Sequence, residues 1–191
     1  YTLIENNEIA QISLIQPTYE FYTSGNIKTN ELGAFAGIAT IDGLVRIKNN
    51  RIHTISNKVM SATTPVVDKY LLMGIRNEIN GGNCRLINEA NDIYGVSAGY
   101  LNDAPLNAAY VYGIFCIIKN QAANKSKALG TVKGNRVILG NDFSDYAMGQ
   151  GTGFGAINLS IPRASVLTEN LAQLDAYDNI AAITQFKFKE G

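Results

Sequence analysis

Residues 148–159, MGQGTGFGAINL, carry glycine at every second position: Gly149, Gly151, Gly153 and Gly155. A glycine-rich turn that leads into a helix is how dinucleotide-binding proteins hold a pyrophosphate. Here the following residues, AINLSIPRA, include β-branched side chains and a proline, which favour an extended segment over a helix. In an extended chain the four glycines share one face, and that bare face lets another backbone approach closely. We therefore expect a close contact between strands or between subunits, and no phosphate site.

Histidine and carboxylates are the other groups that could do chemistry. His53 is the only histidine, so a Ser–His–Asp or Cys–His arrangement would have to use it, but it lies in a strand-like segment and is expected on a sheet face. Glu89 with Asp92, and Asp142 with Asp145, could bind Ca²⁺ or supply a glycosidase pair of acids. Their spacing does not match an EF-hand loop, and such residues more often set turns. We predict no catalytic residue, no metal ligand and no cofactor.

A candidate recognition surface lies in residues 91–103, NDIYGVSAGYLND. Tyr94 and Tyr100 stand there among Gly, Ser and Asn, which is the composition of adaptable binding loops. Asn91, Asp92, Tyr94 and Tyr100 are therefore the candidate contacts for a glycan or a receptor. The chain has no Trp, so an aromatic platform for a sugar would have to come from its 10 Tyr and 7 Phe.

Composition limits the class of protein. The 191 residues suit one domain, 1–191, with an extended N-terminal arm over residues 1–17. Charged residues make up 17%, below the roughly 25% of an average soluble protein, and 21 residues are Asn. With a net charge of +0, little electrostatic repulsion opposes self-association, and a nucleic-acid partner is not expected. No apolar run approaches the roughly 18 residues of a membrane span.

Strand signals run through most of the chain. Two hairpins are predicted, over residues 44–56 with a turn at Asn49-Asn50 and over residues 128–140 with a turn at Gly134-Asn135. Further strands are predicted over residues 18–23, 33–41, 108–119 and 182–189. The last of these places Phe186 and Phe188 on one face of an edge strand. No internal repeat is evident, and Cys84 and Cys116 are expected as two buried thiols or as a single disulfide.

Two segments have helical features. Residues 64–82 offer Thr64 as an N-cap, Pro65 in the first turn and apolar residues at helical spacing, although residues 70–76 could also form a strand that turns at 80–83. Residues 167–177 offer Thr168 as a second cap. The sequence thus predicts an α+β, mainly β fold: an antiparallel sandwich or barrel of short strands with about two covering helices.

Low charge, many Asn and Gly, and many short strands favour a non-catalytic structural protein. We expect self-assembly into a homo-oligomer or filament, as a virion component (capsid decoration, tail tube or fibre domain) or a secreted fibre subunit. The four glycines and the Phe186/Phe188 strand would make the contacts, and other virion or surface proteins or a glycan would be further partners. The alternatives are an extracellular glycan- or receptor-binding module and a carboxylate-based hydrolase.

Overall fold

A computed structural model describes residues 1–16, 36–59, 69–79, 83–100, 109–118, 128–140, 152–160 and 172–183. Every regular element in these ranges is a β-strand. The strands are β1 (Thr2–Glu5), β2 (Glu8–Gln16), β3 (Ala36–Ile41), β4 (Leu44–Lys48), β5 (Arg51–Val59), β6 (Lys69–Ile79), β7 (Cys84–Glu89), β8 (Asp92–Tyr100), β9 (Ala109–Ile118), β10 (Ala128–Lys133), β11 (Arg136–Leu139), β12 (Thr152–Ser160), β13 (Ala172–Tyr177) and β14 (Ile180–Ile183).

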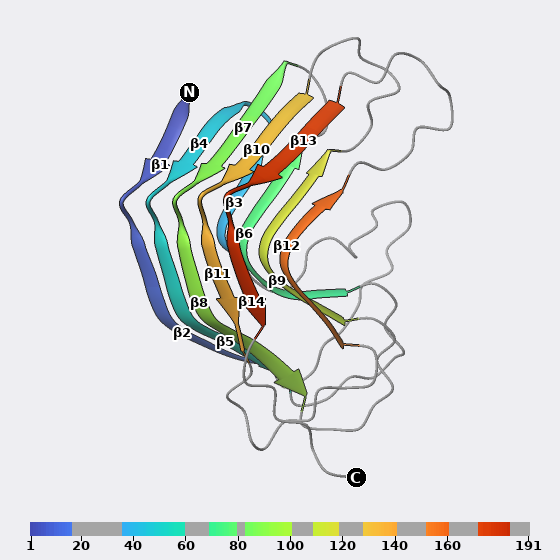
Figure 1. Cartoon of the computed structure of the whole chain (residues 1–191). Coiled ribbons are helices and arrows are strands. Elements are labelled where there is room, and N and C mark those ends of the chain that lie inside the picture. The colour runs from blue at the N-terminus through green and yellow to red at the C-terminus, as the bar shows by residue number, and fades with distance from the viewer. Residues whose placement is uncertain are drawn as a thin grey trace, which may run out of the picture.

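The strands form three parallel sheets (Figure 1). Sheet A has the order β1-β4-β7-β10-β13, sheet B has the order β14-β11-β8-β5-β2, and sheet C has the order β12-β9-β6-β3. Consecutive strands of the chain lie in different sheets, so the chain winds from sheet A to B to C and returns to A one position further along. The architecture is a parallel β-helix, in which each coil is a repeat that buries its apolar side against its neighbours. Coils 1 to 4 each supply three strands (β1–β3, β4–β6, β7–β9 and β10–β12), and coil 5 supplies β13 and β14.

A two-residue corner joins sheet A to sheet B in every coil. Its first residue has a positive φ and its second is an asparagine. The first residues are Asn6 (58°), Asn49 (53°), Ala90 (52°), Gly134 (61°) and Asp178 (55°). Left-handed backbone is strained for most side chains but is tolerated by Gly, Asn and Asp, which explains four of the five residue choices. Ala90 is the exception.

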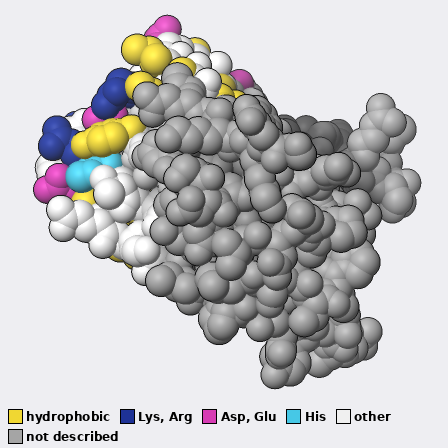
Figure 2. Space-filling view, turned by 90° about the horizontal axis from the view of Figure 1, so that it is seen from below, with side chains coloured by type: hydrophobic (Ala, Val, Ile, Leu, Met, Phe, Trp, Pro, Cys, Tyr) yellow, Lys and Arg dark blue, Asp and Glu magenta, His cyan; other side chains and the backbone are white. Residues whose placement is uncertain are grey.

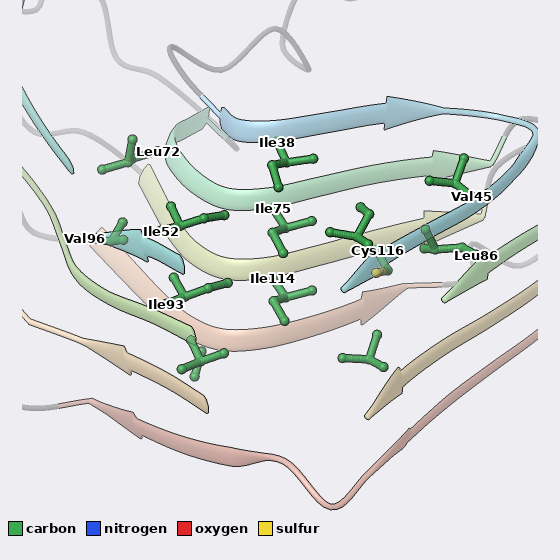
Figure 3. Packing of buried hydrophobic residues seen from close by; sticks show 14 of the residues in the cluster. Ile38, Val45, Ile52, Leu72, Ile75, Leu86, Ile93, Val96, Ile114 and Cys116 are labelled. Atoms are coloured by element: carbon green, nitrogen blue, oxygen red, sulfur yellow. The ribbon is translucent and has the colours of Figure 1, made fainter. Parts of the chain in front are cut away.

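The core consists of columns of like residues. Ile38, Ile75 and Ile114 pair in register along sheet C, and Ile52 and Ile93 do so along sheet B (Figure 3). Ile52, Ile75, Ile93 and Ile114 are fully buried. Sheet B packs against sheet C at Gly113, where a side chain would not fit: a Cβ built on Gly113 would lie 2.1 Å from Cγ1 of Val137.

The prediction of an antiparallel sandwich or barrel with covering helices is wrong, because all pairings are parallel and the described residues contain no helix. Within the predicted helix 64–82 the structure has strand β6, as the alternative interpretation of residues 70–76 had it. Residues 80–82 of the turn expected there lie outside the described residues, and the next strand, β7, lies in a different sheet. Within the predicted helix 167–177 it has β13. The predicted strands 33–41 and 108–119 correspond to β3 and β9, whereas residues 18–23 and 184–189 lie outside the described residues.

Both predicted hairpins are wrong as well. β4 and β5 lie in different sheets, as do β10 and β11, because the chain turns a corner instead of folding back. Asn50 and Asn135 are 0% and 1% exposed, so these turn residues point into the molecule and not into solvent. Residues 1–16, expected as part of an arm, form β1 and β2, which pair with β4 and β5.

Candidate functional site

A ladder of five asparagines runs along the corners of the coils: Asn7, Asn50, Asn91, Asn135 and Asn179. Neighbouring members are separated by 43, 41, 44 and 44 residues. Oδ1 of each asparagine after Asn7 accepts both the backbone N–H and the side-chain Nδ2 of the asparagine in the preceding coil, at 2.9–3.1 Å. The ladder therefore has a direction: donors point toward coil 5 and acceptors toward coil 1.

The same asparagines satisfy the main chain at the corner. Nδ2 of Asn91 donates to the carbonyl of Ile47 at 3.1 Å, and Nδ2 of Asn50 donates to that of Ile4 at 2.9 Å. Asn135 and Asn179 repeat this contact one and two coils further along. Buried polar groups are costly unless they are hydrogen-bonded, so the ladder is what allows a polar corner to lie inside the coil stack.

Two rows of side chains flank the ladder. The first charge row lies two residues before each asparagine and the second charge row lies one residue after it. The first charge row is Glu5, Lys48, Glu89, Lys133 and Tyr177; the second is Glu8, Arg51, Asp92, Arg136 and Ile180. Strand pairing brings the members of each row side by side. In both rows the sign alternates from coil 1 to coil 4, so opposite charges are neighbours, and coil 5 replaces charge with apolar bulk.

Ion pairs join residues of these rows to neighbouring coils. Glu89 pairs with Arg46 and, at 3.2 Å, with Lys133. Burial alone would raise the pKa of Glu89, but the hydrogen bonds from Arg46 and Lys133 outweigh it and hold that pKa below its ordinary value. Arg136 donates from Nη2 to Oδ2 of Asp92 at 2.9 Å, and its Nε lies 2.7 Å from Oδ1 of the same carboxylate. The hydrogen bond to Asp92 is the main reason why the pKa of the guanidinium is raised.

His53 lies on the outer face of sheet B, in a chain of polar contacts. Its Nε2 lies 3.0 Å from Oε1 of Glu8 and its Nδ1 lies 3.0 Å from Oγ1 of Thr54. The ring stacks on Tyr94 with centroids 4.8 Å apart and planes 2° apart, and the Arg136 guanidinium lies 5.3 Å from the centre of Tyr94. Figure 2 shows charged side chains of both signs beside the histidine on the described surface.

Hydroxyl, imidazole and carboxylate follow one another here in the order of a hydrolytic triad. The hydrogen bond from His53 is the main reason why the pKa of Glu8 lies below its ordinary value. Chemically, this arrangement can hold a proton between Glu8 and the ring. Structurally, it links coil 1 to coil 2, and the stack on Tyr94 extends the link to coil 3.

The structure does not bring the predicted ligand-contact residues together at one site. Asn91 is 2% exposed and belongs to the ladder, whereas Asp92 and Tyr94 lie on the outer face of sheet B, where both contact Arg136. Tyr100 is the last residue of β8, so the segment predicted as a loop is a strand up to that residue.

Of the four alternating glycines, Gly153 and Gly155 lie in β12, next to Tyr110 and Tyr112 of β9. A Cβ built on Gly155 would lie 2.6 Å from the Tyr112 ring, so a neighbouring strand of the same chain uses this bare face. The remaining predicted residues lie outside the described residues: Gly149, Gly151, Phe186, Phe188, Asp142 and Asp145.

Cys84 and Cys116 are both buried thiols, as the first of the two expectations had it. Sγ of Cys116 accepts hydrogen bonds from Asn77 and Asn88 at 3.4 and 3.5 Å, and burial raises the pKa of this thiol to about 12. In the described ranges, no three His, Cys, Asp or Glu side chains gather as a metal site would need. Nor do these ranges hold a helix with the length and apolarity to cross a membrane.

The ladder and its charge rows are the features that sequence reasoning missed. The signal is a five-residue pattern: a charged residue, a residue suited to positive φ, asparagine, a second charge, and Ile or Val. It occurs at residues 5–9, 48–52, 89–93 and 133–137, with Ala90 as the one departure, and it fades at residues 177–181, where only the asparagine and its predecessor conform. Aligning the chain with itself at an offset of 41 to 44 residues would have shown it.

No family model matches this sequence, and the searches of curated proteins and of solved structures gave no significant match.

Proposed function

We propose that this protein is a non-catalytic structural component that self-assembles, in a virion or in a secreted fibre. The observation that carries the proposal is the ladder, which crosses all five coils and bonds each to the next through side chain and main chain. A stack of this kind is a rigid body whose length increases by whole coils. Such a body suits a structural subunit that keeps other subunits of an assembly at a fixed distance.

The outer face supports the same role. Its charged groups are engaged with one another: Glu8 with His53 and Arg51, and Asp92 with Arg136. Tyr94 contributes its ring to the stack with His53. These contacts connect neighbouring coils. Glu, His, Asp and Arg are common in catalytic sites, but here they stabilise the stack.

The test is native mass with negative-stain imaging of the purified 191-residue chain at micromolar concentration. A ring, a closed oligomer or a filament is the expected result. A monomer across the concentration range would contradict self-assembly.

A glycan-binding module is the second candidate, because Tyr94 and Asp92 do share the outer face of sheet B. A glycan array probed with the chain and with its Tyr94→Ala variant tests it. Binding that the substitution abolishes would favour this function over a purely structural one.

A further inference from the structure

A proton-binding group lies on the outer face of sheet B, where His53 of coil 2 meets Glu8 of coil 1. Oε1 of Glu8 lies 3.0 Å from Nε2 of the ring, and the His53 side chain is 17% exposed. Histidine is the side chain whose charge ordinarily changes near pH 6.5, at about the acidity of mild acid. His53 is the only histidine of the sequence, so it is the side chain through which mild acid would act on this face.

Both ring nitrogens of His53 keep a partner whether or not the ring is charged. Thr54 has a φ of 54°, which is unusual for a β-branched residue, and its Oγ1 lies 3.0 Å from Nδ1. A hydroxyl can donate to a bare ring nitrogen or accept from a protonated one. Nε2 can donate to Glu8 in either charge state. Protonation therefore adds a charge beside a carboxylate without removing a hydrogen bond.

The other charged groups around the imidazole leave Glu8 as the described acid in contact with it. Arg51, on the same strand, lies 3.8 Å from the Glu8 carboxylate, farther than the ring does. On the other side of the ring lie Tyr94 and Asp92 of β8 and Arg136 of β11. Arg136 is paired with Asp92, so its charge is largely balanced there. The ring thus has one carboxylate at hydrogen-bonding distance, and the nearby guanidinium groups each have an acid of their own.

We propose that His53 and Glu8 form a proton-dependent clasp, which stabilises coil 1 against coil 2 in mild acid and weakens when the ring loses its proton. His53 also stacks on Tyr94, with ring centroids 4.8 Å apart, so the clasp acts across coils 1 to 3. The stability of these coils becomes a function of pH in a range where carboxylates elsewhere in the stack stay charged. This inference does not depend on self-association.

The clasp operates between two pH limits. The pKa of Glu8 is lowered in the folded chain, chiefly by the hydrogen bond with His53, so the contribution of this carboxylate is complete above 4.5 and is lost as the pH falls through that value. The carboxylate favours the charged ring, so the contribution of the ring is complete below the ordinary range near pH 6.5 and is lost as the pH rises through it. Both groups are charged between these limits, and the stabilisation should be largest near about pH 5.5.

Urea unfolding of the 191-residue chain at pH 5.5 and at pH 8.0 tests the clasp. Two variants serve for comparison: His53→Phe keeps an aromatic ring beside Tyr94 but binds no proton, and Glu8→Gln keeps an acceptor but carries no charge. The change in the unfolding equilibrium constant between the two pH values should favour the folded state at pH 5.5 by at least about twofold more in the unaltered chain than in either variant.

The matched control is Asp92→Asn, which removes a carboxylate from the same row of side chains, one that contacts Arg136 and not the ring. Its change between the two pH values should equal that of the unaltered chain. Equal changes in the unaltered chain, His53→Phe and Glu8→Gln overturn the proposal. A change that Glu8→Gln retains, or that Asp92→Asn loses, would assign the effect to another acid and overturns it too. Native mass tests self-assembly separately, so the two proposals can fail independently.

Discussion

At the scale of single residues, the ladder asparagines satisfy the hydrogen-bonding groups of the main chain at the corner. A buried amide has two donors and an acceptor, and Asn91 uses all of them: it donates to Ile47 and Asn135 and accepts from Asn50. A shorter or apolar side chain would leave the main-chain groups of two neighbouring coils without partners inside the protein. The side chain is therefore part of the backbone hydrogen bonding of the fold.

We predict that Asn91→Ala lowers the free energy of unfolding by about 2 to 5 kcal/mol, because the Asn50 N–H and the Ile47 carbonyl lose their partners in a buried site. Asn7→Ala, at the exposed end of the same ladder, should cost less than about 1 kcal/mol, because water replaces the lost partners. Urea unfolding of both variants measures the difference. Equal costs would mean that burial of the ladder does not contribute.

The ion pairs of Glu89 should make the stability of the folded chain depend on pH. Its pKa is held below the ordinary value of 4.5 in the folded chain, so the unfolded chain takes up the proton first as the pH falls. Its contribution to stability is complete above about pH 4.5 and is lost as the pH falls through that value toward the folded pKa. We expect the melting temperature of the unaltered chain to fall more steeply below pH 4.5 than that of Glu89→Gln. Parallel curves would contradict the role of this ion pair.

At the scale of elements, the corner explains both the success and the failure of the sequence analysis. Two strand-like runs around Asn49-Asn50 were predicted correctly as strands, since Ile and Val alternate there and Asn permits positive φ. The same two residues fit a hairpin turn and a corner. What separates them is the partner of Asn50, which lies 41 residues away at Asn91 and cannot be found by local patterns.

The mistaken helix over residues 64–82 has a related cause. Ile75 and Ile79 are spaced by four, and an even spacing places residues on one face of a strand as well as of a helix. Pro65 and Thr64 then favoured the helix. Asp92 and Tyr94 were proposed as ligand contacts from composition alone, and that role stays a prediction; the structure places both beside Arg136. The charge rows depend on parallel register, so they could not be predicted without the repeat.

The corner also predicts the effect of two complementary substitutions. Ala90 has a φ of 52° and Gly134 has a φ of 61° at equivalent positions, and Ala90 is exposed. Ala90→Gly should raise the free energy of unfolding by about 1 kcal/mol, because it relieves left-handed strain. Gly134→Ala should lower it by a similar amount; no atom lies closer than 4.0 Å to the added Cβ, so crowding plays no part.

Thermal or urea unfolding measures both variants of the corner. Opposite signs are the expected outcome. The same sign for the two would show that the corner conformations of coils 3 and 4 are not equivalent.

At the scale of the whole molecule, burial increases from the ends to the middle. Ile47, Ile52 and Ile93 in coils 2 and 3 are fully buried, whereas Leu3 in coil 1 is 50% exposed and Ile180 in coil 5 is 63% exposed. In a stack whose repeats contact only their neighbours, the end coils have one stabilising interface and the inner coils have two. Stability should therefore be graded along the stack.

Hydrogen exchange followed by mass spectrometry should show this gradient. The amides of β7 and β8 are expected to exchange most slowly, and those of β1, β2, β13 and β14 to exchange faster by at least about tenfold. Uniform protection across the five coils would instead indicate a single cooperative unit.

The strict succession of coils has a consequence for length. Neighbouring strands are about 4.8 Å apart, so the five strands of sheet A span only about 19 Å. Gaining or losing 41 to 44 residues at a ladder asparagine would change that span by one strand spacing while leaving the first and last edges as they are. A gene can thus adjust the length of such a stack in increments of about 4.8 Å, by duplicating or deleting an inner coil, without changing a residue of coil 1 or coil 5.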